Sequence, residues 1–171
     1  QFSAAVARTL TGETVPLDAA AHAVSLNGAA VAHAAAALDH APLVVLGSLR
    51  NAAAVAAAAL AEQHRRGART SIAVIAAGEL VSGADGAPLR VAVEDLLGAG
   101  AVIDALSTLG VDHTSPEAAA ACEAFRGLRG AVRHLLTASG SGQQLIERGL
   151  RDQVLAASEV DASASVPALR S

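Results

Sequence analysis

The stretch that decides the fold is residues 42–66, PLVVLGSLRNAAAVAAAALAEQHRR. It begins with a continuous apolar run from Pro42 to Gly47, which predicts a strand buried on both faces of a sheet. The Ala-rich segment that follows predicts a helix from about Asn51 to Arg66, with basic residues in its last turn and Gly67 as its cap. This stretch therefore predicts one βα unit.

Two similar units flank it along the chain. Ala21 to Ser25 is a weaker strand-like run, and an Ala-rich helix follows it to about His40. Ser71 to Ala77, SIAVIAA, is a third strand-like run, after which a loop leads to a helix beginning near Val93. The alternation predicts an α/β fold of three layers, α/β/α, around a mostly parallel sheet. We expect this sheet to lack its N-terminal strand or strands, and the unpaired edge that results favours a homo-oligomer.

The C-terminal third reads as helices. Ser115 and Pro116 mark a helix start, as N-cap and first helical residue. Apolar residues from Phe125 onward then recur at helical spacing. A break is predicted at Gly149, with a further helix to about Glu159 and an extended tail at residues 166–169.

Composition restricts the classes of function. The length of 171 residues fits a single domain spanning residues 1–171. A net charge of -4 leaves no basic stripe for a phosphate backbone, so we expect no nucleic-acid partner. The uncharged stretch 19–38 is mostly Ala and includes His and Asn, so we expect no membrane span. A single cysteine, Cys122, fits a reducing cytoplasm.

Polar residues follow the first two predicted strands, where open parallel sheets bind their ligands. Together they form a candidate site for a small phosphorylated anion: Ser25, Asn27, Gly28, Ser48, Arg50 and Asn51. A helix start with free amides, a hydroxyl and a guanidinium suits phosphate, sulfonate or carboxylate. The alternative is that Ser48 or Asn51 only caps the helix and Arg50 is solvated.

Carboxylates follow the third predicted strand. Glu79 comes directly after it, and Glu94 and Asp95 open the next helix. Three carboxylates at one sheet edge predict a Mg²⁺ site, because Mg²⁺ prefers oxygen ligands. The alternative for Glu94 and Asp95 is compensation of the helix dipole. An anion site and a carboxylate cluster on the same edge favour metal-assisted phosphoryl chemistry.

Several strings then resemble those of the 2-phosphosulpholactate phosphatase family, in the family's order. They are GSLRNAAAVA (47–56), IAVIAAGEL (72–80), LR with VEDLLGAGAVIDAL (89–106), SPEA (115–118), SGQQLIERGLRDQV (141–154) and the final VPAL. SLNGAA (25–30) is similar to the family's Asn-Gly turn. The resemblance implies a Mg²⁺-dependent α/β phosphatase, a phosphoric monoester hydrolase that releases phosphate from 2-phosphosulpholactate to give sulpholactate in coenzyme M biosynthesis.

The chain also departs from the family pattern. The resemblance implies that it corresponds to the C-terminal portion of the family's domain, and Leu26 stands where the family pattern leads us to expect Pro. Gln143 and Gln144 replace an expected Arg and Glu, and Gln153 replaces an expected Asp. The alternative function is therefore a truncated or catalytically inactive relative that retains only an anion site. The sequence does not identify the nucleophile.

Overall fold

The computed structural model describes residues 26–40, 42–67, 70–80 and 88–169. Most of the described chain is helical. The helices are α3 (Leu26–Ala36), α4 (Ala52–Arg66), α5 (Val93–Thr108), α6 (Pro116–Leu128), α7 (Val132–Ala138), α8 (Gly140–Glu147) and α9 (Arg151–Ala157), with the 3-10 turns η1 (Leu49–Asn51) and η2 (Arg129–Ala131). The described strands are β1 (Val44–Val45), β2 (Glu79–Leu80), β3 (Leu89–Arg90) and β4 (Ala168–Leu169).

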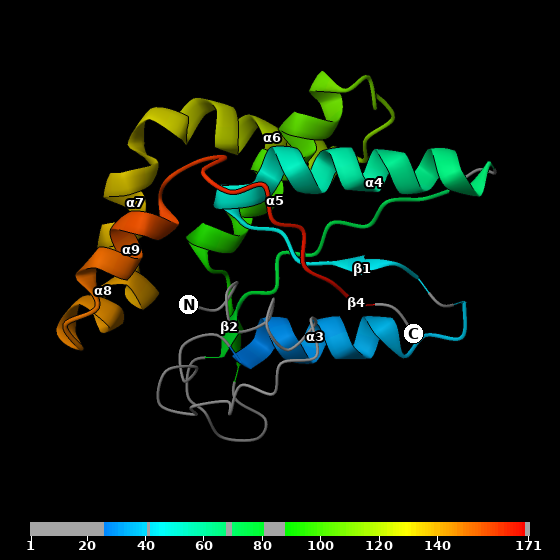
Figure 1. The fold of residues 1–171 in the computed structure, drawn as a ribbon. Helices are drawn as coiled ribbons and strands as arrows, with labels where there is room; N and C mark the ends of the chain where they lie inside the picture. The colour runs from blue at the N-terminus through cyan, green and yellow to red at the C-terminus, as the bar shows by residue number, and fades with distance from the viewer. Residues whose placement is uncertain (1–25, 41, 68–69, 81–87, 170–171) are drawn as a thin grey trace.

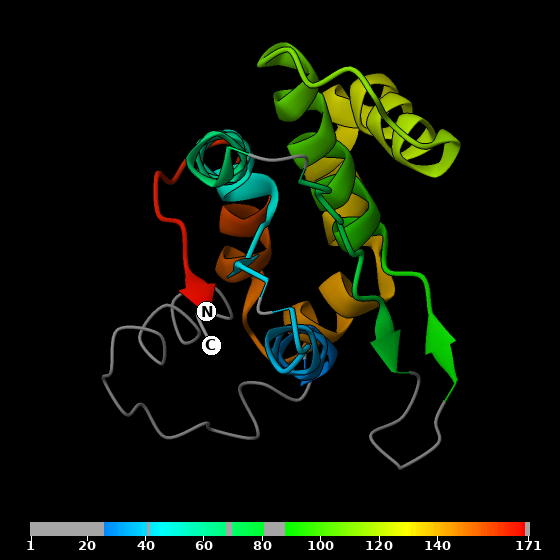
Figure 2. The same ribbon diagram turned by 90° about the vertical axis from the view of Figure 1, so that its right-hand side faces the viewer.

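The strands form two small antiparallel pairs. β1 pairs with β4, with Val44 opposite Leu169, and β2 pairs with β3, with Glu79 opposite Arg90. Helices α3 and α4 lie on opposite sides of the β1–β4 pair (Figure 1). The β2–β3 pair lies beside α3 and apart from β4 (Figure 2). The chain is thus a mixed α/β protein, but the predicted three-layer arrangement around a mostly parallel sheet is not confirmed in the described residues.

The strand predicted at Ser71 to Ala77 is wrong. Residues 71–77 have no regular secondary structure, and the large side chains of Val74 and Ile75 are exposed. A strand needs a neighbour for its backbone N–H and C=O groups, and no described strand pairs with this segment. Apolar β-branched content alone therefore did not produce a strand. The strand predicted at Ala21 to Ser25 lies outside the described residues.

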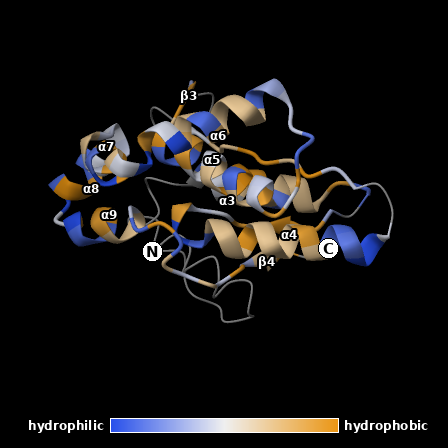
Figure 3. Ribbon diagram, turned by 90° about the horizontal axis from the view of Figure 1, so that it is seen from above, coloured by the Kyte–Doolittle hydropathy of each residue, from blue (hydrophilic) through white to orange (hydrophobic). Residues whose placement is uncertain are grey.

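The predicted βα unit at residues 42–66 is confirmed in outline. The apolar run contributes only the short strand β1, whose residues are half-buried and not buried on both faces as predicted, and its partner is the predicted extended tail. Helix α4 ends at Arg66, as predicted, and Gly67 caps it in the left-handed conformation at φ 61°. The last turns of α4 are hydrophilic, as Figure 3 shows.

Helix α5 is the centre of the core. It packs on α4 and α6, and its Leu97 is fully buried together with Phe125 of α6. Gly100 makes this packing close, because a Cβ there would overlap the Ala121 carbonyl of α6.

The predicted helix signals of the C-terminal third are confirmed. Ser115 Oγ accepts the Ala118 N–H at 3.2 Å and caps α6. Gly149, at φ 76°, separates α8 from α9. Helices α7, α8 and α9 gather at one end of the molecule (Figure 1). Among the described helices, none combines the length and apolar character needed to cross a membrane.

Candidate functional site

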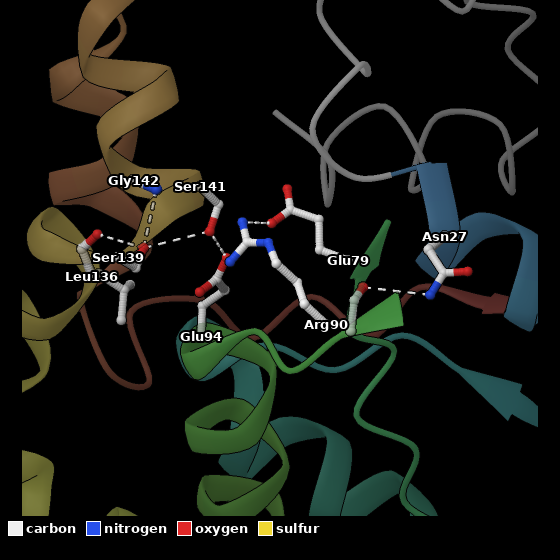
Figure 4. Close-up of polar contacts among 9 residues, drawn as sticks. Asn27, Glu79, Arg90, Glu94, Leu136, Ser139, Ser141 and Gly142 are labelled. Carbon is white, nitrogen blue, oxygen red and sulfur yellow. Dashed lines mark hydrogen bonds and ion pairs between the residues drawn. The ribbon is translucent and has the colours of Figure 1, made fainter. Parts of the chain in front are cut away.

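The carboxylates predicted from the sequence gather at the first turn of α5. β2 carries Glu79, its partner β3 carries Arg90, and α5 begins with Glu94 and Asp95 in its first turn. The charges of Glu94 and Asp95 both act on Glu79. We call Glu79, Arg90, Glu94, Asp95 and Ser141 the carboxylate cluster; Figure 4 shows all of them except Asp95.

Glu79 and Arg90 form an ion pair across the β2–β3 ladder. The Glu79 side chain is 12% exposed and that of Arg90 34%. Burial raises the pKa of Glu79, Arg90 opposes that change, and the charges of Glu94 and Asp95 add to it. Glu79 is thus a largely buried carboxylate with one cation beside it and two anions nearby.

Asp95 lies in the same environment, and no cation among the described residues forms an ion pair with it. Burial, and secondly the charge of Glu94, raise the pKa of Asp95 to about 6. A hydrogen bond from the Gly78 backbone N–H opposes this rise. Asp95 is therefore ionised at neutral pH at a cost in folding free energy.

Glu94 has one oxygen held and one oxygen without a partner. Ser141 Oγ of α8 donates a hydrogen bond to Glu94 Oε1. Glu94 Oε2 is buried, and no group in the described part of the chain hydrogen-bonds to it. A buried unpaired carboxylate oxygen is costly, so it indicates a functional role or an external partner.

The segment Ser139 to Gly142 places the Ser141 hydroxyl. Ser139 Oγ accepts the Gly142 N–H at 3.0 Å and caps α8, and it donates to the Leu136 carbonyl at 2.9 Å. A Cβ at Gly142 would overlap the Leu136 carbonyl. A Cβ at Gly140 would lie 3.1 Å from the Arg90 guanidinium, so α8 begins directly against the ion pair.

Helix α3 reaches the same region through Asn27. Its side-chain amide donates to the carbonyls of Ala77 and Gly78, the latter at 3.4 Å. Figure 4 shows Asn27 pointing toward the strand that carries Arg90. Two predicted site residues, Asn27 and Gly28, thus stand at the start of a helix tied to the backbone just before Glu79. Ser25 lies outside the described residues.

The predicted anion-binding residues of η1 are engaged elsewhere. Arg50 donates to the Ala156 carbonyl and pairs with Glu159 at 2.7 Å. Asn51 is buried, and its Oδ1 accepts the backbone N–H of Ser48 at 2.8 Å and the Ser48 hydroxyl at 3.0 Å. Its amide donates to the carbonyls of Leu46 at 3.1 Å and Ser165 at 2.9 Å. We call Ser48, Arg50 and Asn51 with these partners the η1 junction.

The η1 junction and the carboxylate cluster are neighbours along α5. Gly98 lies one turn after Glu94 in α5 and packs against η1. A Cβ added at Gly98 would lie 3.7 Å from the backbone nitrogen of Leu49. The two groups of predicted site residues are therefore on adjoining elements, but the Arg50 guanidinium points to the end of α9.

Sequence reasoning missed Arg90, Ser139 and Ser141. The available signals were the LR pair before α5 and the Ser-Gly-Ser-Gly start of α8. Neither signal shows which carboxylate the side chain contacts. Arg90 lies 11 residues from its partner Glu79 in the sequence, and Ser141 lies 47 residues from its partner Glu94.

Mg²⁺ is the metal that the sequence predicts for this cluster. Among the described residues, no three Asp, Glu, His or Cys side chains form a group arranged to hold a metal ion. Mg²⁺ commonly uses only one or two carboxylates, with waters and substrate phosphate oxygens completing its shell. The cluster brings together three carboxylates, with Arg90 as a cation beside Glu79, and Glu94 Oε2 has no hydrogen-bond partner in the described part of the chain. These groups fit a divalent cation held by two carboxylates.

Comparison with known protein families agrees with the resemblance in the sequence. A family model described as 2-phosphosulpholactate phosphatase matches residues 14–171. The match includes every residue of the carboxylate cluster and of the η1 junction. The family is one of phosphoric monoester hydrolases. The chain belongs to the 2-phosphosulpholactate phosphatase family.

Proposed function

We propose that this chain is a Mg²⁺-dependent phosphatase that converts 2-phosphosulpholactate to sulpholactate and phosphate, with the carboxylate cluster as its metal site. The observation that carries the proposal is Glu94 Oε2, a buried carboxylate oxygen with no partner in the described residues. It lies among carboxylates in a member of a phosphatase family.

In this proposal Glu94 and Asp95 hold the cation, and Glu79 is the third carboxylate beside it. When bound, Mg²⁺ would neutralise charge on the phosphoryl oxygens and polarise the ester. The raised pKa values of Glu79 and Asp95 support a bound cation, because neighbouring carboxylate charge contributes to both. Arg90 keeps Glu79 in place and limits the negative charge that an anionic substrate meets.

Substrate contacts are also proposals. Asn27 and Gly28, at the start of α3, are the predicted substrate-binding residues nearest the cluster, because Asn27 bonds to the backbone beside Glu79. Arg50 stays a predicted anion-binding residue, but its contacts with Ala156 and Glu159 favour a structural role. The same is true of Asn51, whose amide is fully used.

A non-catalytic relative is the second candidate, and residues of α8 favour it. Gln143 and Gln144 replace the Arg and Glu expected from the family pattern, and both are exposed on the helix that carries Ser141. Gln143 uses its side-chain amide to bond the Thr137 carbonyl. The absence of these two charged side chains from α8 supports a chain without turnover.

The test is a phosphate-release assay on 2-phosphosulpholactate, with Mg²⁺, without added metal and with EDTA. The proposal predicts release that needs Mg²⁺, stops in EDTA and is restored by excess Mg²⁺. Full activity in EDTA would contradict the metal site. No release by a folded chain that still binds the substrate would favour the non-catalytic relative.

We also propose a cytoplasmic, single-domain protein that self-associates. Support for self-association is the apolar exposure around the β2–β3 pair, where Ile75 is 61%, Leu89 60% and Val91 79% exposed. Size-exclusion chromatography over a range of concentrations tests it, and a monomer throughout would contradict it.

A further inference from the structure

We infer that Ser141 is a positioning residue: its hydroxyl fixes the Glu94 carboxylate through Oε1 so that Oε2 faces the bound cation. The inference rests on the proposed function, since it assigns to Glu94 the role of a metal ligand. It adds a residue of α8 that does not itself touch the cation or the substrate.

The contact between the two side chains is partly buried. Ser141 is 5% exposed, and its Oγ donates to Glu94 Oε1 across 47 residues of sequence. Only one of the two carboxylate oxygens is therefore held by the described residues. A hydrogen bond to one oxygen of a ligating carboxylate orients the other oxygen, which is how partners outside the ligand set tune a metal site.

Contacts on both sides of Ser141 hold the backbone of the first turn of α8. Ser139 Oγ caps the helix through the Gly142 N–H at 3.0 Å and also lies 3.4 Å from Ser141 Oγ. The absence of a side chain at Gly142 lets the Leu136 carbonyl approach closely. The Ser139 cap and the close packing at Gly142 thus hold the first turn of α8, and this turn places the Ser141 hydroxyl against Glu94 Oε1.

A purely structural role for Ser141 makes a different prediction. If the hydroxyl only satisfied a buried carboxylate, its removal would lower the free energy of unfolding and leave metal affinity unchanged. If it positions Glu94, its removal lowers metal affinity by about 10- to 100-fold, the usual effect of losing such a partner. Metal affinity therefore separates the two roles.

The experiment measures Mn²⁺, used alone as a paramagnetic substitute for Mg²⁺, binding to the full chain by electron paramagnetic resonance. The variants are Ser141→Ala and Ser141→Cys, which has nearly the same volume but is a weak donor. The control is Ser158→Ala, because the Ser158 hydroxyl bonds the Leu155 carbonyl of its own helix at 2.6 Å. Thermal unfolding of each variant shows that it is folded.

We expect both Ser141 variants to bind Mn²⁺ about 10- to 100-fold more weakly, with Ser158→Ala unchanged. Phosphate release by the Ser141 variants should need more Mg²⁺ and approach the wild-type rate at saturation. Wild-type affinity in a folded Ser141 variant would overturn the inference, as would a wild-type chain that binds no Mn²⁺. If the wild type binds Mn²⁺ but releases no phosphate, the proposed function fails and the positioning role is still decided by the affinities.

Discussion

The η1 junction and the carboxylate cluster were both predicted from polar residues that follow apolar runs, yet their side chains are used differently. In the η1 junction both the oxygen and the nitrogen of the Asn51 side-chain amide hydrogen-bond to other protein groups. Arg50 is likewise paired with Glu159 and the end of α9. In the carboxylate cluster a buried oxygen of Glu94 has no partner within the described residues.

The difference shows how to separate structural polar groups from functional ones. A polar group whose donors and acceptors all have protein partners contributes to the fold. Asn51 is such a group, because its amide hydrogen-bonds to the Ser165 carbonyl in the C-terminal segment. A buried polar group without a hydrogen-bond partner lowers the stability of the fold, and a bound ligand can restore that stability by supplying the partner.

Glu94→Gln should abolish most phosphatase activity. Gln keeps an oxygen that can accept from Ser141 but removes the charge, so we expect kcat/KM to fall by more than about 100-fold, beyond the loss from a residue that only orients a ligand. Stability should not fall, because the charge of Glu94 raises the pKa of both Glu79 and Asp95 by repulsion. Phosphate release and denaturant unfolding measure the two effects. Activity within a few-fold of wild type would place the metal site elsewhere.

Asn51→Ala should affect stability and not chemistry. The change leaves the Leu46 and Ser165 carbonyls without their donor, and we expect the free energy of unfolding to fall by about 2 to 4 kcal/mol. Asn51→Asp should also destabilise, since an ionised carboxylate oxygen would face those carbonyls. Urea unfolding checks both variants. A loss of activity in the folded fraction, with stability unchanged, would instead support a site at η1.

Asp95→Asn should stabilise the metal-free chain in a pH-dependent manner. Because burial and Glu94 raise the pKa of Asp95 to about 6 in the folded state, the folded wild type binds more protons than the unfolded chain between about pH 4 and 6. Wild-type stability therefore falls as pH rises through that window.

At pH 7 in EDTA the Asp95→Asn variant should be more stable than wild type by about 1 to 2 kcal/mol, after allowance for solvent screening. The difference should shrink toward zero near pH 4. Unfolding curves at several pH values measure it. Equal stabilities at pH 7 would mean that Asp95 carries no such repulsion.

Arg50→Ala should have the smallest effect. The ion pair with Glu159 is partly exposed, so we expect a loss of about 1 kcal/mol of stability and a change in kcat/KM below about threefold. If Arg50 binds the substrate anion, kcat/KM should instead fall by about tenfold to a hundredfold. A double-mutant cycle with Glu159→Gln measures the pair's own contribution to stability.

Local signals in the sequence predicted much of the helical part of the fold. The Ser115 cap, the Gly67 cap and the Gly149 break each depend on one or two residues, and the structure confirms them. Strand pairing depends on distant segments, so the sequence did not show that Val44 pairs with Leu169 or that none of the described strands pairs with residues 71–77.

In the candidate site, too, local signals could be predicted from the sequence and contacts between distant segments could not. The carboxylates could be predicted because they directly follow an apolar run and open a helix. Arg90 and Ser141 could not, since only the chain's three-dimensional path places them against Glu79 and Glu94. Arg50 was predicted from its local position alone, and its partner Glu159 is 109 residues away.

Calorimetric titration of Mg²⁺ into the metal-free chain distinguishes the two regions most directly. We compare wild type with Glu94→Gln and with Glu159→Gln, which removes the same charge from the η1 junction. We predict one Mg²⁺ site in the wild type and in Glu159→Gln, and none in Glu94→Gln. Unchanged Mg²⁺ binding in Glu94→Gln, or its loss in Glu159→Gln, would contradict the assignment of the metal site to the carboxylate cluster.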